Sequence, residues 1–224
     1  MRILALDTST EHCSAALWRD GCLESDDVLA GQRHSELLLP MVDGLLVRHG
    51  LKVTDLDGIA FGHGPGSFTG LRIACGVVQG LAFGATLPVV GVSTLLAVAE
   101  AVQAARAVCC LDARMGQVYH AAYEREGAGW ITVSQPALCA PETSPPLPGG
   151  APWTACGSGF KAYGDILARR YAGCLSAVIA DAYPQARHIA RLAVAEFEQG
   201  RALAAEHAVP VYIRDKVALR SDER

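Results

Sequence analysis

Residues 2–10, R-I-L-A-L-D-T-S-T, form a short apolar run that ends in Asp7 and three hydroxyl side chains. An apolar run of this length that ends in turn-forming residues predicts a buried β-strand. Residues 107–116, A-V-C-C-L-D-A-R-M-G, repeat the pattern halfway along the chain, with Asp112 in the place of Asp7. Two apolar strands that each open one half of the chain and end in Asp predict a duplicated unit.

The first half continues as a series of strands and helices. Two further strands are predicted at residues 12–20 and 21–30, joined around Asp20-Gly21, which is a strong hairpin signal. The pattern then predicts, in order, a helix at 35–49, a strand at 58–61, a helix at 69–85, a strand at 89–92 and a helix at 93–105. Three antiparallel strands followed by alternating helices and strands predict a mixed α/β sheet.

The second half repeats this order in weaker form. Residues 107–126 predict a buried strand, a turn around Arg114-Met115-Gly116 and a partner strand, and residues 130–133 are a candidate third strand. The proline-rich residues 141–152 predict an irregular surface excursion, and residues 216–224 are expected to fray. A strand at 153–156 and helices at 161–171 and 184–200 complete the prediction. We expect two domains, residues 1–105 and 106–224, with the helix at 184–200 packing back on the first.

Composition limits the class of protein. The chain has 224 residues, of which 51% are hydrophobic and 19% charged, as expected for a globular protein of one large or two small domains. A net charge of −4 argues against wholesale binding to nucleic acid or to an anionic membrane. Asp7 interrupts the first apolar run too early for a signal peptide, and Gln79, Pro88 and three glycines break the stretch at 76–92, so no membrane span is expected. Eight cysteines without a C-x-x-C pair indicate a reduced, cytoplasmic protein.

Residues 62–70, G-H-G-P-G-S-F-T-G, place four glycines directly before a predicted helix. Such loops bind phosphate in many proteins, because the first N–H groups of the helix are free and its dipole favours an anion. However, no Lys follows the loop, Thr69 stands where G-x-G-x-x-G requires glycine, and Pro65 breaks a G-x-S-x-G pattern around Ser67. Two interpretations remain: a rigid turn in which Ser67 or Thr69 caps the helix, or an anion site.

Five stretches, in this order, resemble the TsaB (YeaZ) family: I-L-A-L-D-T-S-T at 3–10, R-H-S-E-L-L-L-P at 33–40, G-P-G-S-F-T-G-L-R-I at 64–73, L-D-A-R-M-G-Q-V-Y at 111–119 and P-V-Y-I-R-D at 210–215. The resemblance covers nearly the whole chain. It implies the duplicated actin/Hsp70/sugar-kinase-like fold, built from two RNase H-like halves. It also implies a place in the bacterial machinery that makes threonylcarbamoyladenosine at position 37 of tRNA. In that machinery the paralogue TsaD is the catalytic transferase and TsaE is an ATPase.

Nucleotide-binding members of this fold carry an Asp-containing phosphate loop after the first strand of each half. Here the first loop lacks glycine, and the second places Arg114 and Met115 where a phosphate needs room. Two interpretations stay open: strand-end aspartates that bond their own turns, or a vestigial nucleotide or anion site. The candidate residues of that site are Asp7, Thr8, Ser9, Gly64, Gly66, Ser67, Thr69 and Asp112.

Metal chemistry is not expected. The catalytic paralogue binds its metal through histidines one helical turn apart, whereas here His34 is followed one turn later by Leu38. We therefore expect neither a catalytic metal nor a cofactor.

Two helices carry the strongest interaction signal. The helix around 36–47, E-L-L-L-P-M-V-D-G-L-L-V, is apolar almost all round, although packing on one sheet needs a single stripe. The next helix has glycines at 76, 80 and 84, each costing about 1 kcal/mol against alanine. Tight packing within the fold and docking of a partner both explain these features. The resemblance favours a partner, because family members associate through these two helices. The predicted interface is His34, Glu36, Leu38, Met41, Val42, Leu45, Arg72, Gly76, Gly80 and Gly84.

We therefore expect a cytoplasmic, non-catalytic subunit that binds and activates TsaD together with TsaE. Alone it is expected to form a homodimer, and its contact with tRNA is expected to be indirect or weak. The alternative is a nucleotide-binding enzyme of the same fold, either a kinase-like phosphotransferase or a glycoprotease-type hydrolase.

Overall fold

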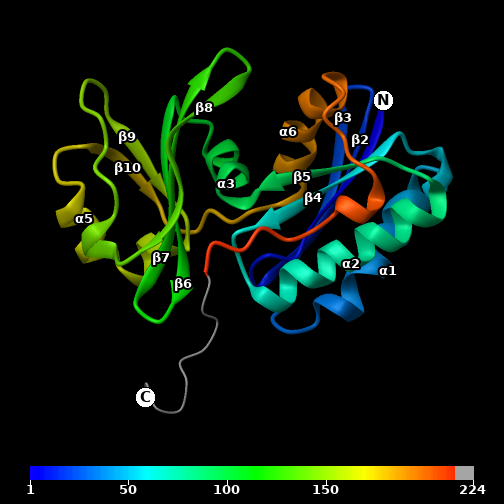
Figure 1. Ribbon diagram of the computed structural model, residues 1–224, viewed down its shortest axis with the longest axis horizontal. Helices are drawn as coiled ribbons and strands as arrows, with labels where there is room; N and C mark the ends of the chain where they lie inside the picture. Colours follow the sequence, from blue (N-terminus) through cyan, green and yellow to red (C-terminus); the bar gives the residue numbers. More distant parts are fainter. Residues whose placement is uncertain (215–224) are drawn as a thin grey trace.

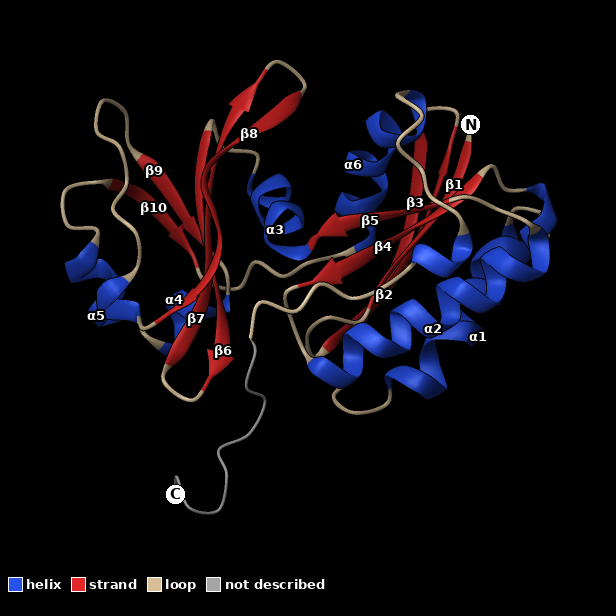
Figure 2. Cartoon of the chain, in the orientation of Figure 1, coloured by secondary structure: helices blue, strands red, loops and turns tan. Residues whose placement is uncertain are grey.

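The computed structural model describes residues 1–214 and divides them between two β-sheets of five strands each (Figures 1 and 2). The two sheets stand side by side, with helices on their outer faces and two helices, α3 and α6, between them (Figure 2). The predicted tail at 216–224 lies outside the described residues.

The first sheet contains β1 (Arg2–Asp7), β2 (His12–Arg19), β3 (Cys22–Leu29), β4 (Gly58–Gly64) and β5 (Val89–Ser93), in the order β3-β2-β1-β4-β5. The first three strands are antiparallel, and β1, β4 and β5 are parallel. The β2–β3 hairpin turns at Asp20 and Gly21, which both have positive φ, as a tight two-residue turn requires. The predicted strands and hairpin are confirmed, and β4 continues beyond the predicted residue 61 to Gly64.

The second sheet repeats the first. It contains β6 (Arg106–Arg114), β7 (Gln117–Glu126), β8 (Gly129–Cys139), β9 (Trp153–Cys156) and β10 (Leu175–Ile179), in the order β10-β9-β6-β7-β8. Here β6 takes the central place of β1, with two antiparallel strands on one side and two parallel strands on the other. The predicted duplicated α/β fold is therefore confirmed.

Helices cover both faces of the first sheet. The helices α1 (His34–Arg48) and α2 (Phe68–Ala85) lie on one face, and α6 (Ala186–Glu198) lies on the other (Figure 1). Side chains of a strand alternate between faces, so Leu4 and Leu6 of β1 join the core under α1 and α2, whereas Ile3 and Ala5 join the core under α6. Helix α6 thus packs on strands of the first half, while the domain bounds 1–105 and 106–224 stay predictions.

Some helices and strands differ from the sequence prediction because their local sequence signals were weak. Helix α3 (Thr94–Val102) ends before the predicted residue 105, because Gln103 adopts a left-handed φ of 49°. The single helix predicted at 161–171 is two short helices, α4 (Ser158–Ala162) and α5 (Gly164–Arg170), which meet at Tyr163. Strand β8 is longer than the predicted 130–133, and β10 was not predicted, since its five residues are mostly exposed and lack a clear alternation.

Candidate functional site

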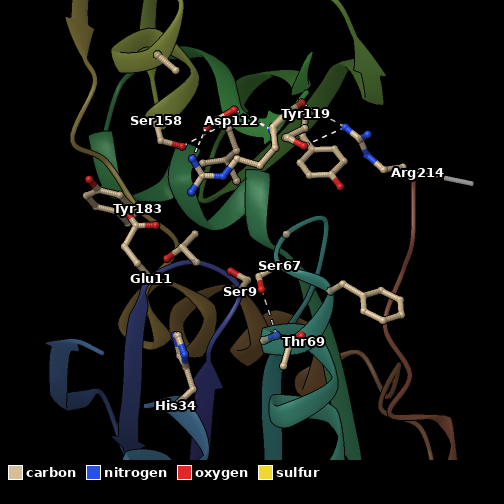
Figure 3. Close-up of a pocket in the computed structure, with 18 of the residues that line it drawn as sticks. Ser9, Glu11, His34, Ser67, Thr69, Asp112, Tyr119, Ser158, Tyr183 and Arg214 are labelled. Carbon is tan, nitrogen blue, oxygen red and sulfur yellow. Dashed lines mark hydrogen bonds and ion pairs between the residues drawn. The ribbon is translucent and has the colours of Figure 1, made fainter. Parts of the chain in front are cut away.

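A cavity of about 920 Å³ lies between the two halves, where the ends of β1 and β6 meet (Figure 3). The first half contributes the turn after β1, the start of α1 and the start of α2. The second half contributes the β6–β7 hairpin and the start of α4. The residues that line the cavity include Ser9, Glu11, Gly66, Ser67, Phe68, Thr69, Asp112, Arg114, Tyr119, Ser158, Lys161 and Arg214.

The turn after β1 is held by Asp7, which is fully buried behind the cavity. Its Oδ1 accepts hydrogen bonds from the backbone N–H of Ser9 (3.0 Å) and from the Ser9 hydroxyl (2.8 Å). Its Oδ2 has no partner among the described residues. Burial raises the pKa of Asp7 to about 7, and the two bonds from Ser9 only partly oppose this. Asp7 therefore bonds its own turn, as the strand-end interpretation proposes.

The glycine-rich loop packs directly against that turn. A Cβ atom at Gly62 would overlap the Asp7 carboxylate, one at Gly70 would overlap the Thr8 carbonyl oxygen, and one at Gly66 would lie 2.5 Å from the Ser9 carbonyl oxygen. The Ser67 N–H donates to the Ser9 carbonyl at 2.8 Å. The glycines are therefore needed because the loop and the turn approach backbone to backbone.

Ser67 begins helix α2 as its N-cap, since its hydroxyl accepts from the N–H of Gly70 at 3.3 Å. Thr69, the other predicted cap, lines the cavity, as Ser67 also does. Of the predicted anion-site residues, Ser9, Gly66, Ser67, Thr69 and Asp112 line the cavity. Asp7, Thr8 and Gly64 do not line it.

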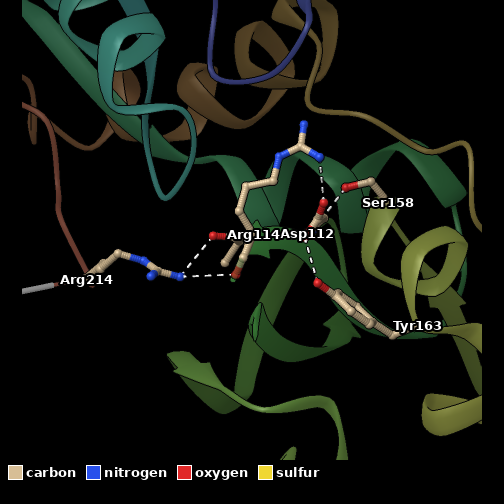
Figure 4. A network of polar contacts seen from close by, with 6 residues as sticks. Asp112, Arg114, Ser158, Tyr163 and Arg214 are labelled. Atoms are coloured by element: carbon tan, nitrogen blue, oxygen red, sulfur yellow. Dashed lines mark hydrogen bonds and ion pairs between the residues drawn. The ribbon is translucent and has the colours of Figure 1, made fainter. Parts of the chain in front are cut away.

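On the opposite wall, the Asp112 carboxylate is already bonded (Figure 4). Its Oδ1 accepts from the Arg114 N–H at 2.8 Å and from the Tyr163 hydroxyl at 3.3 Å, and its Oδ2 pairs with the Arg114 guanidinium at 3.0 Å. The Asp112 N–H donates to the Ser158 hydroxyl at 3.1 Å. Asp112 thus organises the β6–β7 hairpin, and its carboxylate is already paired with the Arg114 guanidinium.

Several lining residues belong to no sequence motif, because the fold brings them together from separate segments. Glu11 follows the first turn, and Lys161 on α4 pairs with Asp181 at 2.9 Å. Arg214 reaches the cavity from the end of the described chain. Its only sequence signal was its place in the stretch P-V-Y-I-R-D.

The described residues 1–214 contain no hydrogen bond that joins a serine hydroxyl or a cysteine thiol to a histidine, and no cluster of three metal-ligating side chains. Burial raises the pKa of Cys13 to about 12 and that of Cys75 to about 11, so these thiols stay protonated at neutral pH. His34 is buried, with its Nε2 3.2 Å from the carbonyl oxygen of His12, to which it donates.

The predicted partner stripe on α1 needs correction. Leu38, Val42 and Leu45 are buried in the core between α1, α2 and the sheet, and Met41 is half-buried. Leu38, Val42 and Leu45 are covered by the protein's own core, because this side of the helix is the one that packs on the sheet. The exposed apolar side chains of α1 are Leu39 (49% exposed) and Val47 (67%). Glu36 is also exposed and pairs with Arg33 at 3.1 Å.

The three predicted interface glycines of α2 are on the surface, unlike Gly70 of the same helix, which is buried. A Cβ atom at Gly76, Gly80 or Gly84 would meet nothing within 4 Å. Arg72 and Phe83 lie on the same side of the helix, and Phe83 is 81% exposed. By length and apolar composition alone, α2 meets the criteria for a membrane-crossing helix. It does so because Arg72 is the single charged residue among the eighteen of this helix.

Two duplicated sheets around a central cavity define a protein of the actin-like fold class. A model of the family described as TsaD, tRNA N6-adenosine threonylcarbamoyltransferase, matches residues 28–221. The Escherichia coli K12 protein named tRNA threonylcarbamoyladenosine biosynthesis protein TsaB is 40% identical over 227 residues, which cover 97% of this chain and 96% of that protein. The chain belongs to the TsaB (YeaZ) family.

Solved structures from Pseudomonas aeruginosa agree with this assignment. YeaZ superposes with a TM-score of 0.88 at 38% identity, covering 94% of this chain and 99% of that chain. A protein described as uncharacterized, with similarity to peptidase YEAZ, gives a TM-score of 0.89 at 38% identity, covering 95% and 99%.

Proposed function

We propose that this chain is a non-catalytic subunit of the machinery that makes threonylcarbamoyladenosine on tRNA, and that it binds and activates TsaD together with TsaE. The family supports the pathway, since its E. coli relative is named a biosynthesis protein of this modification. The match to the TsaD family model supports a paralogous partner, because two chains of one fold can pair through equivalent helices.

The observation that carries the proposal is the exposed outer side of α2, where Phe83 is uncovered and the space above three glycines is open. We call Arg72, Gly76, Gly80, Phe83 and Gly84, with Leu39 and Val47 of the neighbouring α1, the docking face. Internal packing explains none of the three glycines, because the space above each is open. A smooth glycine ridge lets a partner helix approach to about 8–10 Å, and burial of Phe83 contributes about 1.5–3 kcal/mol. In the absence of TsaD, a second copy of the chain occupies this face.

The test is Gly80→Arg, with Gly164→Arg as the matched control. Both glycines lie in helices, face open space and lack a positive φ, but only Gly80 is on the docking face. An unpaired arginine buried in the contact costs about 3 kcal/mol, so affinity for TsaD should fall about 100-fold. Size-exclusion chromatography with light scattering should show Gly80→Arg as a folded monomer, and tRNA modification with TsaD and TsaE should be lost. If Gly80→Arg still dimerises and supports modification, the docking face is misplaced.

The enzyme alternative makes an opposite prediction. We infer that the cavity does not bind ATP productively, because its glycine loop is packed against the β1 turn and Arg114 covers Asp112. The purified chain alone should therefore neither hydrolyse ATP nor modify tRNA. Robust ATP turnover that is lost in Asp7→Ala would favour a phosphotransferase and overturn the non-catalytic assignment.

A further inference from the structure

Residues 208–214, A-V-P-V-Y-I-R, cross from the first half to the second after the short helix η3 (Ala205–His207). We call this segment the strap. Figure 1 shows it as the red stretch that runs from beside α2 toward β6. Two other segments also join the halves, residues 103–105 before β6 and residues 180–185 before α6. The strap is held on both sides by side-chain and backbone contacts.

On the first half, the strap lies on the glycine-rich loop. The Val211 N–H donates to the His63 carbonyl at 2.7 Å, and the Gln79 amide donates to the Ala208 carbonyl at 3.0 Å. The Val211 carbonyl oxygen lies so close to Gly64 that a Cβ atom there would be 2.7 Å away. Gly64 is therefore constrained both by the strap and by its own φ of 119°, a conformation that favours glycine, and it does not line the cavity.

Tyr212 extends this attachment to helix α2. Its hydroxyl accepts from the Arg72 Nε at 2.8 Å, and its ring centroid lies 5.4 Å from that of Phe68. The Arg72 guanidinium stacks 3.6 Å above the Phe68 ring. These three side chains form one stacked group at the start of α2.

On the second half, Arg214 binds the β6–β7 hairpin (Figure 4). Its Nη2 donates to the Ala113 carbonyl at 2.9 Å, and its Nη1 lies 3.2 Å from the Met115 sulfur. Ile213 packs against the core of the second half. A planar guanidinium bridges these acceptors as a single positively charged side chain, which makes this a charge-assisted attachment.

The strap crosses at the side of the cavity. Phe68 and Arg214 line both the large cavity and a small pocket under the strap, which is also lined by Pro65, Tyr119 and Ile213. A link at this position resists separation of the glycine loop from the β6–β7 hairpin, which are the two cavity walls.

We propose that the strap is a tie that fixes the separation of the two halves and limits entry to the cavity, with Arg214 as the residue that fastens it. The proposal goes beyond the proposed function and does not depend on it, because every contact involved lies within one chain. Loss of the tie lets the walls separate without unfolding either sheet, since each sheet keeps its own core.

The test is hydrogen–deuterium exchange followed by mass spectrometry on the full chain. Arg214→Ala removes the guanidinium that binds the β6–β7 hairpin. Arg214→Lys keeps the positive charge but lacks the planar guanidinium that reaches both acceptors. Arg19→Ala, on the exposed β2–β3 hairpin, is the control. Since Arg214→Ala removes a charge-assisted hydrogen bond between the two halves, exchange in residues 66–71 and 111–119 should rise at least about tenfold in this variant. The rise should be smaller in Arg214→Lys and absent in Arg19→Ala.

Peptides from β1 and β7 report whether the sheets stay folded. If Arg214→Ala does not fold, the same exchange measurement is made on Arg214→Lys. Exchange in the two cavity walls of that variant should then rise severalfold. Unchanged exchange in both cavity walls overturns the proposal. Faster exchange that is confined to residues 208–214 also overturns it, because the strap would then be attached without holding the walls together.

Discussion

Alanine substitutions at two glycines of α2 should have opposite effects, although they lie six residues apart in one helix. At Gly76 a Cβ atom meets only open space, so Gly76→Ala gains helix propensity and should stabilise the fold by about 0.5–1 kcal/mol. At Gly70 the new Cβ overlaps the Thr8 carbonyl oxygen, a backbone atom that cannot rotate away.

The size of the destabilisation caused by Gly70→Ala follows from the atoms that must move to make room for the new Cβ. Relieving the overlap pushes α2 from the β1 turn and strains the hydrogen bond from the Thr8 hydroxyl to the Gly70 carbonyl, now 2.7 Å. Overpacking costs about 1–3 kcal/mol and the bond contributes about 1 kcal/mol, against a propensity gain of about 1 kcal/mol. Gly70→Ala should therefore destabilise the fold by about 1–3 kcal/mol, which lowers Tm by roughly 2–12 °C in a chain of this size.

The assay is urea unfolding followed by circular dichroism, at a concentration at which light scattering reports a monomer. This condition removes any effect of Gly76 on self-association. A Gly70→Ala variant as stable as the unsubstituted chain would refute the argument that the glycine loop exists for close packing. The anion-site interpretation of the loop would then need to be reopened.

Two further predictions concern the pH dependence of stability. The folded pKa of Asp7 is raised from 3.8 to about 7, so its burial destabilises the fold increasingly as pH rises through this window, by up to about 4 kcal/mol. Asp7→Asn should thus be more stable than the unsubstituted chain at pH 8 in chemical unfolding, with the difference shrinking at pH 5; an equal difference at both pH values would contradict the assigned protonation. His120 is buried with both ring nitrogens unpartnered among the described residues, and burial, aided by Arg170, lowers its pKa from 6.5 to about 4. Because the folded state disfavours the charged imidazole, the free energy of unfolding falls as pH drops from 6.5 toward 4. His120→Phe retains a ring beside Tyr171 but has no group that titrates. Over that pH range the variant's free energy of unfolding should therefore rise by up to about 3 kcal/mol relative to that of the unsubstituted chain. Parallel stability curves for the two proteins between pH 7 and pH 4 would rule out His120 as the cause.

The strands and their duplication were predictable because the signal is local. The apolar runs at 2–7 and 107–112 each carry their own periodicity and terminal Asp, and Asp20-Gly21 determines its hairpin through backbone preferences alone. The predictions that failed concern segments whose own residues give little information about secondary structure. Strand β10 is a short, exposed edge strand, and the break between α4 and α5 at Tyr163 has no proline to mark it.

The candidate site was predictable only in part. The sequence pointed to Ser9, Ser67 and Asp112 as neighbours, and the fold brings all three to one cavity. It also placed Leu38 and Leu45 on a partner surface, although both are buried. An apolar stripe on a helix has the same appearance whether it meets the protein's own sheet or another chain, so composition cannot distinguish them.

The sequence by itself determined the order of elements, the duplication and the family motifs, because these follow from propensities and spacings within short segments. Only the tertiary structure decided what each glycine of the motif is for. Gly70 meets Thr8, Gly64 meets Val211, and Gly80 meets nothing. Arg214 likewise reaches Ala113 from about a hundred residues away. The contacts at these sites join segments distant in the chain, and their geometry exists only once both sheets have formed around their cores.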